Sequence, residues 1–446
     1  MDQAYVHQAI KNGFNNPILQ CDVCRYGSYM GEHTSPMLLL LTPIFNIMNS
    51  HVMIYLVEVL IIFGALFLFF KYILKDKLHL WSIIFILILC SKPFKQALIW
   101  DFREDHLTFL FLSLSFLSLY KKKISLFVVC FLFTLMTKEH LPYFLPFLSI
   151  PILMEKEFDL SKKQRIFLSF FITISSLVWL VTIHKVITPY FNGGAPPTNH
   201  IVGRFPGFGE TNSEVVKNIL TSPKHWWKLI TERVLDLEAW RYILTLFAPF
   251  ILIFKRRWFW VVAASPIFMM NMLSYAKTQR SLSFHYELAI LPLFIFALIL
   301  EVRNFKSSKQ FIWPLMIALC FAGRWPNYYT LKYWPSLDDL QDRQFFASLN
   351  PEKNYAISFK HSAQIAHHRK FGAFKIKENA DSIDQFISQN TKWYQNLSGF
   401  NLMNMKYLIL DLNQPHEENL YNVALKENWA IISKSSSKRF VLMENK

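Results

Sequence analysis

The sequence predicts a polytopic α-helical membrane protein with about ten transmembrane or half-spanning helices, followed by a small C-terminal α/β domain. The 446 residues are 53% hydrophobic and only 17% charged, whereas soluble domains carry about a quarter charged residues. Residues 83–89 and 107–119 carry no charge at all. After Trp325 the apolar stretches become short and alternate with amphipathic ones. We therefore predict a membrane domain over residues 51–325 and an α/β domain over residues 326–446.

The transmembrane helices are predicted from apolar stretches that recur along the membrane domain. A spanning helix needs about 20 apolar residues, although a helix that protein shields from lipid can be shorter. Several stretches are shorter, which is typical of broken or half-spanning helices. The predicted helices cover residues 51–72, 81–98, 105–120, 124–137, 140–154, 166–187, 240–254, 258–275, 286–301 and 311–324.

Residues 1–50 are predicted to form an extracytoplasmic loop that leads into a half-inserted helix over residues 35–49. Cys21 and Cys24 form a Cys-x-x-Cys pair without a second pair or a paired histidine nearby. A zinc site is therefore disfavoured, and a disulfide is favoured if the loop lies outside the cytoplasm.

The distribution of lysine and arginine predicts the orientation. Basic turns alternate along the chain, so about ten crossings place all of them on one side, which is the cytoplasm. The protein is then a multi-pass protein of the cytoplasmic (inner) membrane, with both termini and the 188–239 loop outside. The basic turns hold Lys71, Lys75 and Lys77; Lys121, Lys122 and Lys123; Lys156, Lys162, Lys163 and Arg165; Lys255, Arg256 and Arg257; and Arg303, Lys306 and Lys309.

The net charge of +16 does not indicate a nucleic-acid partner, because much of the excess lies in these turns. The expected partners are membrane lipids. In the 188–239 loop, an amphipathic stretch over residues 213–238 carries Trp226 and Trp227. It is predicted either to lie on the membrane surface with its tryptophans at the headgroups or to pack on the other loops.

The C-terminal residues predict a small α/β domain, because strand-like and helix-like segments alternate. His361, His367 and His368 suggest either a metal site or a solvated helix face, and the second interpretation is favoured. Strands are predicted over residues 355–359, 371–376, 407–412, 430–433 and 439–443, and helices over residues 338–349, 381–394 and 416–427.

Clusters of charged and histidine residues occupy the predicted outer loops. A single cluster is explained by helix capping or ion pairing, and Lys138 with Glu139 would make such a pair. All of the clusters lie on one predicted face of the membrane, and the turns on the other face are interpreted as basic only. This arrangement favours a shared site instead. The clusters are Asp2-Gln3; Glu32-His33-Thr34-Ser35-Pro36; Asp101-Phe102-Arg103-Glu104-Asp105-His106; Lys138-Glu139-His140; and Gln279-Arg280 with His285-Tyr286-Glu287.

The residue types in these clusters suit group transfer at a membrane surface. A carboxylate can take a proton from an acceptor hydroxyl, and Lys, Arg or His can neutralise a phosphate leaving group. Two or three carboxylates in one loop, such as Asp101 and Glu104, also suit a divalent cation.

The motifs, taken in order, resemble the prokaryotic membrane-protein family catalogued as domain of unknown function 2079. That pattern has a transmembrane helix before its Asp-Gln pair, so an apolar segment is expected upstream of Met1. Arg103-Glu104 and His140 depart from the family's His-Pro and Asp. The matching motifs are Asp2-Gln3, His33-Thr34-Ser35-Pro36, the loop from Asp101 to Asp105, Lys138-Glu139-His140, and Gln279-Arg280 with His285-Tyr286.

The resemblance implies a GT-C-like fold, that of the integral-membrane glycosyltransferases that use lipid-phosphate sugar donors. In that superfamily an acidic residue just after the first helix is the usual candidate base, and Asp2 matches its place. The expected catalytic residues are Asp2, Asp101, Glu104 and Asp105. The expected substrate-binding residues are Glu32, His33, Arg103, His106, Lys138, Glu139, His140, Arg280, His285 and Tyr286.

The function expected from these features is transfer of a sugar from a polyprenyl-phosphate donor at the outer face of the membrane. The alternatives are a transporter or flippase, and a non-catalytic membrane protein of envelope assembly. A transporter would need a polar path through the middle of the membrane, and the predicted helices are mostly apolar.

Overall fold

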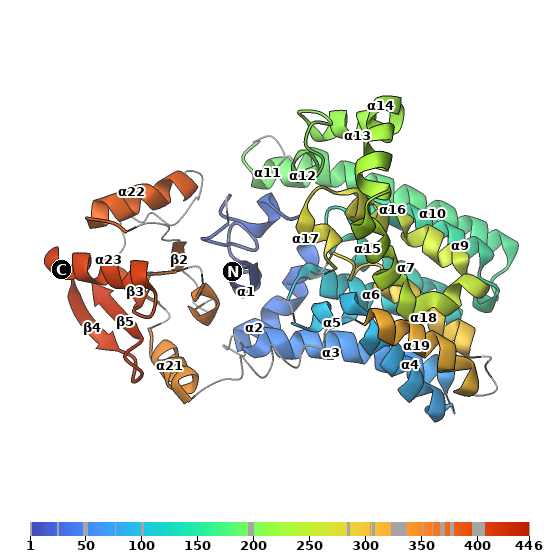
Figure 1. The fold of residues 1–446 in the computed structure, drawn as a ribbon, viewed down its shortest axis with the longest axis horizontal. Helices are drawn as coiled ribbons and strands as arrows, with labels where there is room; N and C mark the ends of the chain where they lie inside the picture. The colour runs from blue at the N-terminus through green and yellow to red at the C-terminus, as the bar shows by residue number, and fades with distance from the viewer. Residues whose placement is uncertain are drawn as a thin grey trace. The chain divides into compact units, whose positions relative to one another are not determined.

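The structure, a computed structural model, divides into two compact units (Figure 1). The end unit comprises Met1–Leu56, Ile187–Ala195 and Asn327–Lys446, and the helical unit comprises Val57–Val186 and Pro196–Pro326. The described residues are 2–24, 26–47, 52–75, 77–99, 102–194, 200–282, 286–303, 305, 308–322, 337–350, 352–358, 360–365, 371–374, 379–394 and 406–445.

The helical unit contains the segments predicted to be transmembrane, and α3 enters it from the end unit. Its helices are α3 (Val52–Phe69), η3 (Phe70–Leu74), α4 (Leu78–Cys90), α5 (Lys92–Ile99), α6 (Glu104–Tyr120), α7 (Ile124–Leu135), α8 (Leu141–Phe144), η4 (Leu145–Leu148), α9 (Ser149–Met154), η5 (Lys156–Phe158), α10 (Lys162–Thr182), η6 (Ile183–Ile187), α12 (His200–Arg204), α13 (Asn212–Thr221), α14 (Pro223–Leu229), η7 (Ile230–Val234), α15 (Leu237–Phe247), η8 (Ala248–Lys255), α16 (Trp258–Leu273), α17 (Lys277–Arg280), α18 (Leu291–Val302), η9 (Ser308–Phe311) and α19 (Ile312–Phe321).

Within the described part of the chain, three helices are long and apolar enough to cross a membrane. They are Met53–Leu74, Lys162–Phe191 and Leu237–Lys255. The pair α4 and α5 would add a fourth span, but it is bent by 84°, where the sequence predicts one continuous helix. The helix breaks at Ser91, whose backbone is extended. Pro93 favours a break there, because it has no N–H to donate to the Leu89 carbonyl and its ring would clash with that carbonyl in a continuous helix. The other predicted spans coincide with helices of 10–17 residues.

Helix α18 lies in the core of the helical unit, and all of its 12 residues are buried. Its Phe296 ring contacts the rings of Phe116, Phe158 and Trp260, with centroids 5.4 to 5.9 Å apart. A helix that is apolar all round is covered by protein or lipid. Protein covers α18, so it need not have the length of a lipid-facing span.

The long predicted loop is largely helical between His200 and Val234. Helix α13 begins at a capping Thr211 side chain and ends before Pro223, which starts α14. Trp226 is 41% exposed and Trp227 is 68% exposed. These indoles are therefore not buried by the rest of the chain, which leaves them available to a membrane surface.

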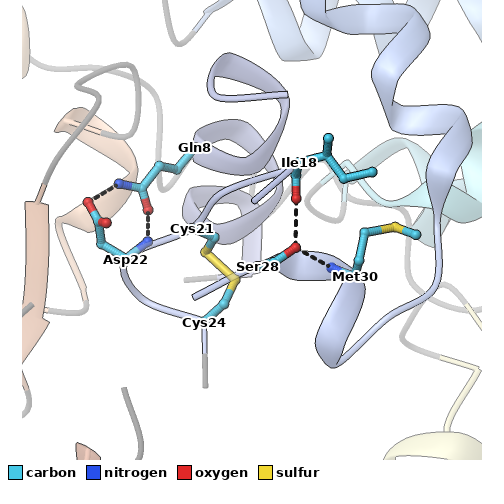
Figure 2. The surroundings of a disulfide bond; sticks show 7 residues. All are labelled: Gln8, Ile18, Cys21, Asp22, Cys24, Ser28 and Met30. Atoms are coloured by element: carbon cyan, nitrogen blue, oxygen red, sulfur yellow. Dashed lines mark hydrogen bonds between the residues drawn. A yellow bond between two sulfur atoms is a disulfide. The ribbon is translucent and has the colours of Figure 1, made fainter. Parts of the chain in front are cut away.

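In the end unit, the N-terminal segment forms α1 (Asp2–Lys11), η1 (Tyr29–Gly31), η2 (Pro36–Leu41) and α2 (Thr42–Ile47). Cys21 and Cys24 form a disulfide (Figure 2), as the sequence favours. The Gln8 side chain holds this loop, because its amide donates to Asp22 Oδ2 and accepts from the Asp22 backbone N–H, both at 3.0 Å. Ser28 Oγ donates to the Ile18 carbonyl at 2.7 Å.

The C-terminal part of the end unit is a five-stranded mixed sheet in the order β2-β1-β3-β5-β4. Strands β1, β2 and β3 are parallel, and β5 is antiparallel to both β3 and β4. All the predicted strands and helices of this domain are present. They are α21 (Leu337–Ala347), β1 (Tyr355–Ser358), η10 (Ser362–Ile365), β2 (Phe371–Phe374), α22 (Ile383–Tyr394), β3 (Tyr407–Asp411), α23 (Pro415–Lys426), β4 (Ala430–Lys434) and β5 (Phe440–Glu444).

The core of this domain forms where one face of the sheet meets α22 and α23. Leu408, Leu410 and Val441 point into it and pack with Phe386 and Leu420. Strand residues at every second position share a face, so Leu408 and Leu410 enter the same core.

The sequence favours a solvated helix face for His361, and this prediction is wrong. It is 9% exposed, and its Nε2 lies 2.7 Å from Asp411 Oδ2 at the end of β3. Arg439 donates to both oxygens of the same carboxylate at 3.1 Å. The histidine is therefore part of a buried ion cluster. His367 and His368 lie outside the described residues.

Candidate functional site

The strongest candidate site is a buried charge cluster in the helical unit, at the start of α6. Glu104 and Asp105 form the first turn of α6, and Lys138 lies in the turn between α7 and α8. Acidic residues are favourable in this position because the N-terminal end of a helix is electropositive. Lys138 Nζ lies 3.0 Å from Glu104 Oε1 and also donates to Asp105 Oδ2.

All three groups are withdrawn from solvent. Glu104 and Asp105 are each 1% exposed, and Lys138 is 7% exposed. Burial by itself lowers the pKa of Lys138, but the nearby carboxylates of Asp105, Glu104 and Glu139 outweigh this effect and raise the pKa above its ordinary value. Lys138 is therefore a fixed positive charge at neutral pH.

Two threonines fasten the lysine turn to α6. Thr108 and Thr137 share a hydrogen bond of 2.7 Å between their hydroxyls, and both side chains are fully buried. Thr137 Oγ1 also lies 2.7 Å from the Thr134 carbonyl. These bonds connect the two segments that carry the cluster, so they fix the distance between Lys138 and the carboxylates.

His106 packs against the start of α6 rather than facing solvent. Its ring is fully buried and stacks on Phe102 with centroids 5.1 Å apart. One ring nitrogen lies 3.0 Å from the Arg103 backbone, and the other lies 3.2 Å from the Ala97 carbonyl and 3.4 Å from Glu58 Oε1. Both nitrogens therefore contact the chain, and we interpret His106 as a positioning residue.

His140 and Arg204 lie around the charge cluster. Burial and the positive charge of Lys138 lower the pKa of His140, so its imidazole is neutral at neutral pH. Arg204, at the end of α12, interacts electrostatically with Glu139, Tyr286 and His140. The site thus combines buried carboxylates, one lysine, one neutral imidazole and an arginine that the sequence analysis did not single out.

The Arg280 guanidinium forms ion pairs with acidic residues at the start of α15. Its Nη2 lies 2.8 Å from Asp236 Oδ2, and its Nη1 lies 3.5 Å from Glu238. A bond from the Glu238 backbone N–H and the Arg280 guanidinium lower the pKa of Asp236. This predicted phosphate-binding residue therefore already has carboxylate partners.

The remaining predicted site residues are not brought into this cluster by the described structure. Asp2 begins α1 in the end unit, and its side chain is not described. Glu32 and His33 also belong to the end unit. Asp101 and His285 lie outside the described residues. The roles assigned to these residues therefore stay predictions.

Metal binding at the cluster also stays a prediction. Among the residues that the structure describes, no group of three or more His, Cys, Asp or Glu side chains is arranged to hold a metal ion. The predicted ligand pair for a divalent cation includes Asp101, which is not described.

Two buried carboxylates were given no role from the sequence. Glu58 is the only charged residue between Val52 and Phe70, and a lone charge inside an apolar helix is a recognised functional signal. Glu287 accepts from Tyr242 at 3.1 Å and from Asn271 at 3.3 Å, and its Oε2 is buried without a partner. Glu287 belongs to the cluster with His285 and Tyr286, but only those two residues were expected to bind substrate.

A second ion network corrects the interpretation that the opposite turns are basic only. Arg257 Nε lies 3.1 Å from Glu155 Oε2, which also accepts from Trp260 Nε1 at 3.1 Å. Arg257 further pairs with Glu301, and Arg303 lies 2.8 Å from Glu157. Acidic residues within the basic turns were missed because only lysines and arginines were counted there.

A family model described as "Predicted membrane protein (DUF2079)" matches residues 19–346 of the chain. No curated protein matches the sequence.

Proposed function

The chain belongs to this family of predicted membrane proteins, and we propose that it transfers a sugar from a lipid-linked phosphate to an acceptor. The observation that carries the proposal is the buried set of Glu104, Asp105 and Lys138. Burying charged groups is costly, and this set places two adjacent carboxylates and a lysine at the N-terminal end of an apolar helix. The acid–base and phosphate-neutralising groups of a glycosyl transfer are of these types.

In the proposed reaction, the acceptor oxygen forms a bond to the anomeric carbon of the sugar. The bond from that carbon to the phosphate oxygen breaks, and the electron pair leaves with the lipid phosphate. The acceptor proton passes to a carboxylate, for which Asp105 and Glu104 are the described candidates, and Asp2 and Asp101 stay alternatives. Lys138 stabilises the charge that develops on the leaving phosphate, because a fixed charge in a poorly hydrated site acts strongly.

The proposal places the reaction on the extracytoplasmic side of the inner membrane, in a GT-C-like arrangement. The disulfide Cys21–Cys24 supports an outer location for the end unit, because disulfides persist in oxidising compartments. Since the C-terminal sheet belongs to the same unit as this disulfide, both should face the same side. The basic turns of the helical unit support a cytoplasmic location for Lys122.

Cysteine labelling in intact cells tests this orientation. Cys320 is the exposed free cysteine among the described residues, so it is first replaced by serine. Lys426 and Lys122 are both exposed. Lys426→Cys should react with an impermeant maleimide, and Lys122→Cys should react only after the cells are opened. The reverse pattern would overturn the orientation and the outer-face site.

A proton-coupled transporter is the second candidate, and a specific observation favours it. Glu58 with His106, and Glu287 with Tyr242 and Asn271, are buried ionisable groups inside the helical unit. Buried carboxylates of this kind serve proton relays in transporters. The non-catalytic envelope protein, by contrast, gains no support from groups that are so costly to bury.

The deciding experiment uses the purified full chain in lipid vesicles with a panel of labelled polyprenyl-phosphate sugars and a mixture of membrane-extracted acceptors. Label should move to an acceptor in the wild type, and Glu104→Gln should lose at least about 100-fold in rate, a typical acid–base contribution. Movement of intact donor across the vesicle membrane, without transfer, would support the transporter and reject the enzyme.

A further inference from the structure

An apolar cavity opens in the helical unit beside the candidate site. Its volume is about 240 Å³, and it is bounded by α12, α13 and the C-terminal half of α16. Ile201, Val216 and Met270 are among its seven apolar lining residues, and Arg204 is the one charged residue in its wall. Mostly apolar concave sites with a few polar groups are the usual form of small-molecule sites.

The Arg204 side chain is half-buried, and the described contacts of its guanidinium are with neutral groups. Its Nη1 contacts Met270 Sδ at 3.7 Å. With the Gln279 amide turned so that its oxygen faces the guanidinium, that oxygen accepts from Nε at 3.0 Å. Within the described chain, no carboxylate oxygen lies within 4.0 Å of the Arg204 guanidinium. Arg257, Arg280 and Arg303 all have such a carboxylate.

Because Arg204 is the charged residue in the wall of an apolar cavity, its guanidinium is available to an external anion. Withdrawing a guanidinium from water is costly unless an anion pairs with it, and burial lowers the pKa of Arg204. The planar fork of arginine suits a phosphate in particular. Because Glu139 and His140 act on Arg204 electrostatically, the guanidinium is near both the cavity and the lysine turn.

We propose that this cavity binds a lipid phosphate, with the phosphate at Arg204 and the first part of the hydrocarbon chain against Ile201, Val216 and Met270. The cavity is smaller than the roughly 300–1,000 Å³ of sites that enclose a whole small molecule, so only the start of the chain fits inside. The rest of the chain would lie in the membrane. This inference rests on the proposed function, since it assigns the lipid end of the donor to a place beside Lys138.

The test measures binding to the purified full chain in neutral detergent, through the rise in melting temperature with ligand concentration. The probes are octyl phosphate below its micelle concentration, inorganic phosphate, octanoate and octanol. Octyl phosphate should act at a concentration at least about ten-fold lower than inorganic phosphate or octanoate, and octanol should have no effect. Equal action of octyl phosphate and octanol would overturn the proposal, as would tighter binding of octanoate.

Two variants locate the binding. Arg204→Gln should weaken octyl phosphate binding at least about ten-fold, a loss of ~1.4 kcal/mol, and Ile219→Trp should block the cavity from its α13 wall. Lys217→Gln is the matched control, because Lys217 is an exposed cation on the same helix. Unchanged binding in both Arg204→Gln and Ile219→Trp would refute the site. If Arg204→Gln fails to fold, octyl phosphate binding by Ile219→Trp and Arg204→Lys still tests the site.

Failure of the lipid-phosphate site can be distinguished from failure of the proposed enzyme function. Binding at Arg204 without sugar transfer in any assay would reject the enzyme and keep the lipid-phosphate site. Sugar transfer with undiminished octyl phosphate binding in Arg204→Gln would keep the enzyme and reject the site.

Discussion

The cluster around Lys138 and the network around Arg257 are both buried and both rich in carboxylates, but they are built differently. Arg257 contacts Glu155 and Glu301, and Glu155 also accepts from Trp260. The end of α9, the start of α16 and the end of α18 are thereby joined. Among the residues that the structure describes, the Lys138 ammonium forms ion pairs with the first turn of α6. The Arg257 network joins three helices, whereas the ion pairs of Lys138 join the α7–α8 turn to α6 alone among the described residues.

The partners of the two cations suggest the same division of roles. An arginine fork makes several directed hydrogen bonds at once and is suited to a permanent buried pair. A lysine is a compact charge that can exchange one anion for another. Lys138 also has two carboxylate partners, so it keeps one if the other is lost. We therefore expect substitutions at Arg257 to change stability and substitutions beside Lys138 to change activity.

The largest expected effect follows from Arg257→Leu. It leaves Glu155 and Glu301 buried without their cation, and breaking a buried pair in this way costs about 3–5 kcal/mol. The free energy of unfolding should fall by that amount, which thermal denaturation of the purified chain measures. Arg256→Leu is the control, because Arg256 is exposed. Equal melting temperatures for both variants would show that the network does not stabilise the fold.

Asp105→Asn should give the next largest effect, on the rate rather than on stability. Glu104 still pairs with Lys138 in this variant, so we expect a loss of only about 1 kcal/mol in the free energy of unfolding. Transfer should fall by at least about 100-fold, or ~2.7 kcal/mol. Rates are measured per folded molecule. Asp159→Asn, which alters an exposed carboxylate at the opposite end, should transfer at the wild-type rate; a shared loss would argue against a local role.

Thr137→Val sharpens the comparison at the base of the site. It removes the hydroxyl that meets Thr108 and should cost about 1 kcal/mol in stability, with a several-fold lower transfer rate because the lysine turn loosens. Thr134→Val is the matched control, since the Thr134 hydroxyl donates to the Cys130 carbonyl of its own helix. If both variants transfer equally well, the threonine pair does not position Lys138.

The smallest effect is expected for Lys122→Ala. Lys122 pairs with Asp159, but their side chains are 60% and 74% exposed, and exposed pairs contribute little. The melting temperature and the transfer rate should both match the wild type. A clear loss of either would mean that exposure does not distinguish structural from dispensable pairs in this protein.

Much of the fold could be predicted from the sequence, because local periodicity carries it. The predicted strands at Tyr407 and Phe440 and the helices around Ile383 and Pro415 are all present. The positions of the apolar helices were predictable for the same reason. Their lengths as spans were not, because Pro93 breaks one segment and α18 is enclosed by protein rather than lipid.

The site was predictable only as a set of residue types at one end of the helices. Nothing local in the sequence pairs Lys138 with Glu104 and Asp105 rather than with its neighbour Glu139. Arg204 follows no periodic pattern, and its importance appears only where α12 meets α16. His361 seemed to be a surface residue because its partner Asp411 lies 50 positions away in the chain. Such pairings are properties of the tertiary fold.

The central claim is that the Lys138 cluster does chemistry and the Arg257 network holds the unit together. One measurement compares Asp105→Asn with Arg257→Lys, recording melting temperature and transfer of labelled sugar per folded molecule on the same preparations. The account predicts a near-normal melting temperature without transfer for Asp105→Asn, and a lowered melting temperature with normal transfer for Arg257→Lys. Wild-type transfer by folded Asp105→Asn would contradict it.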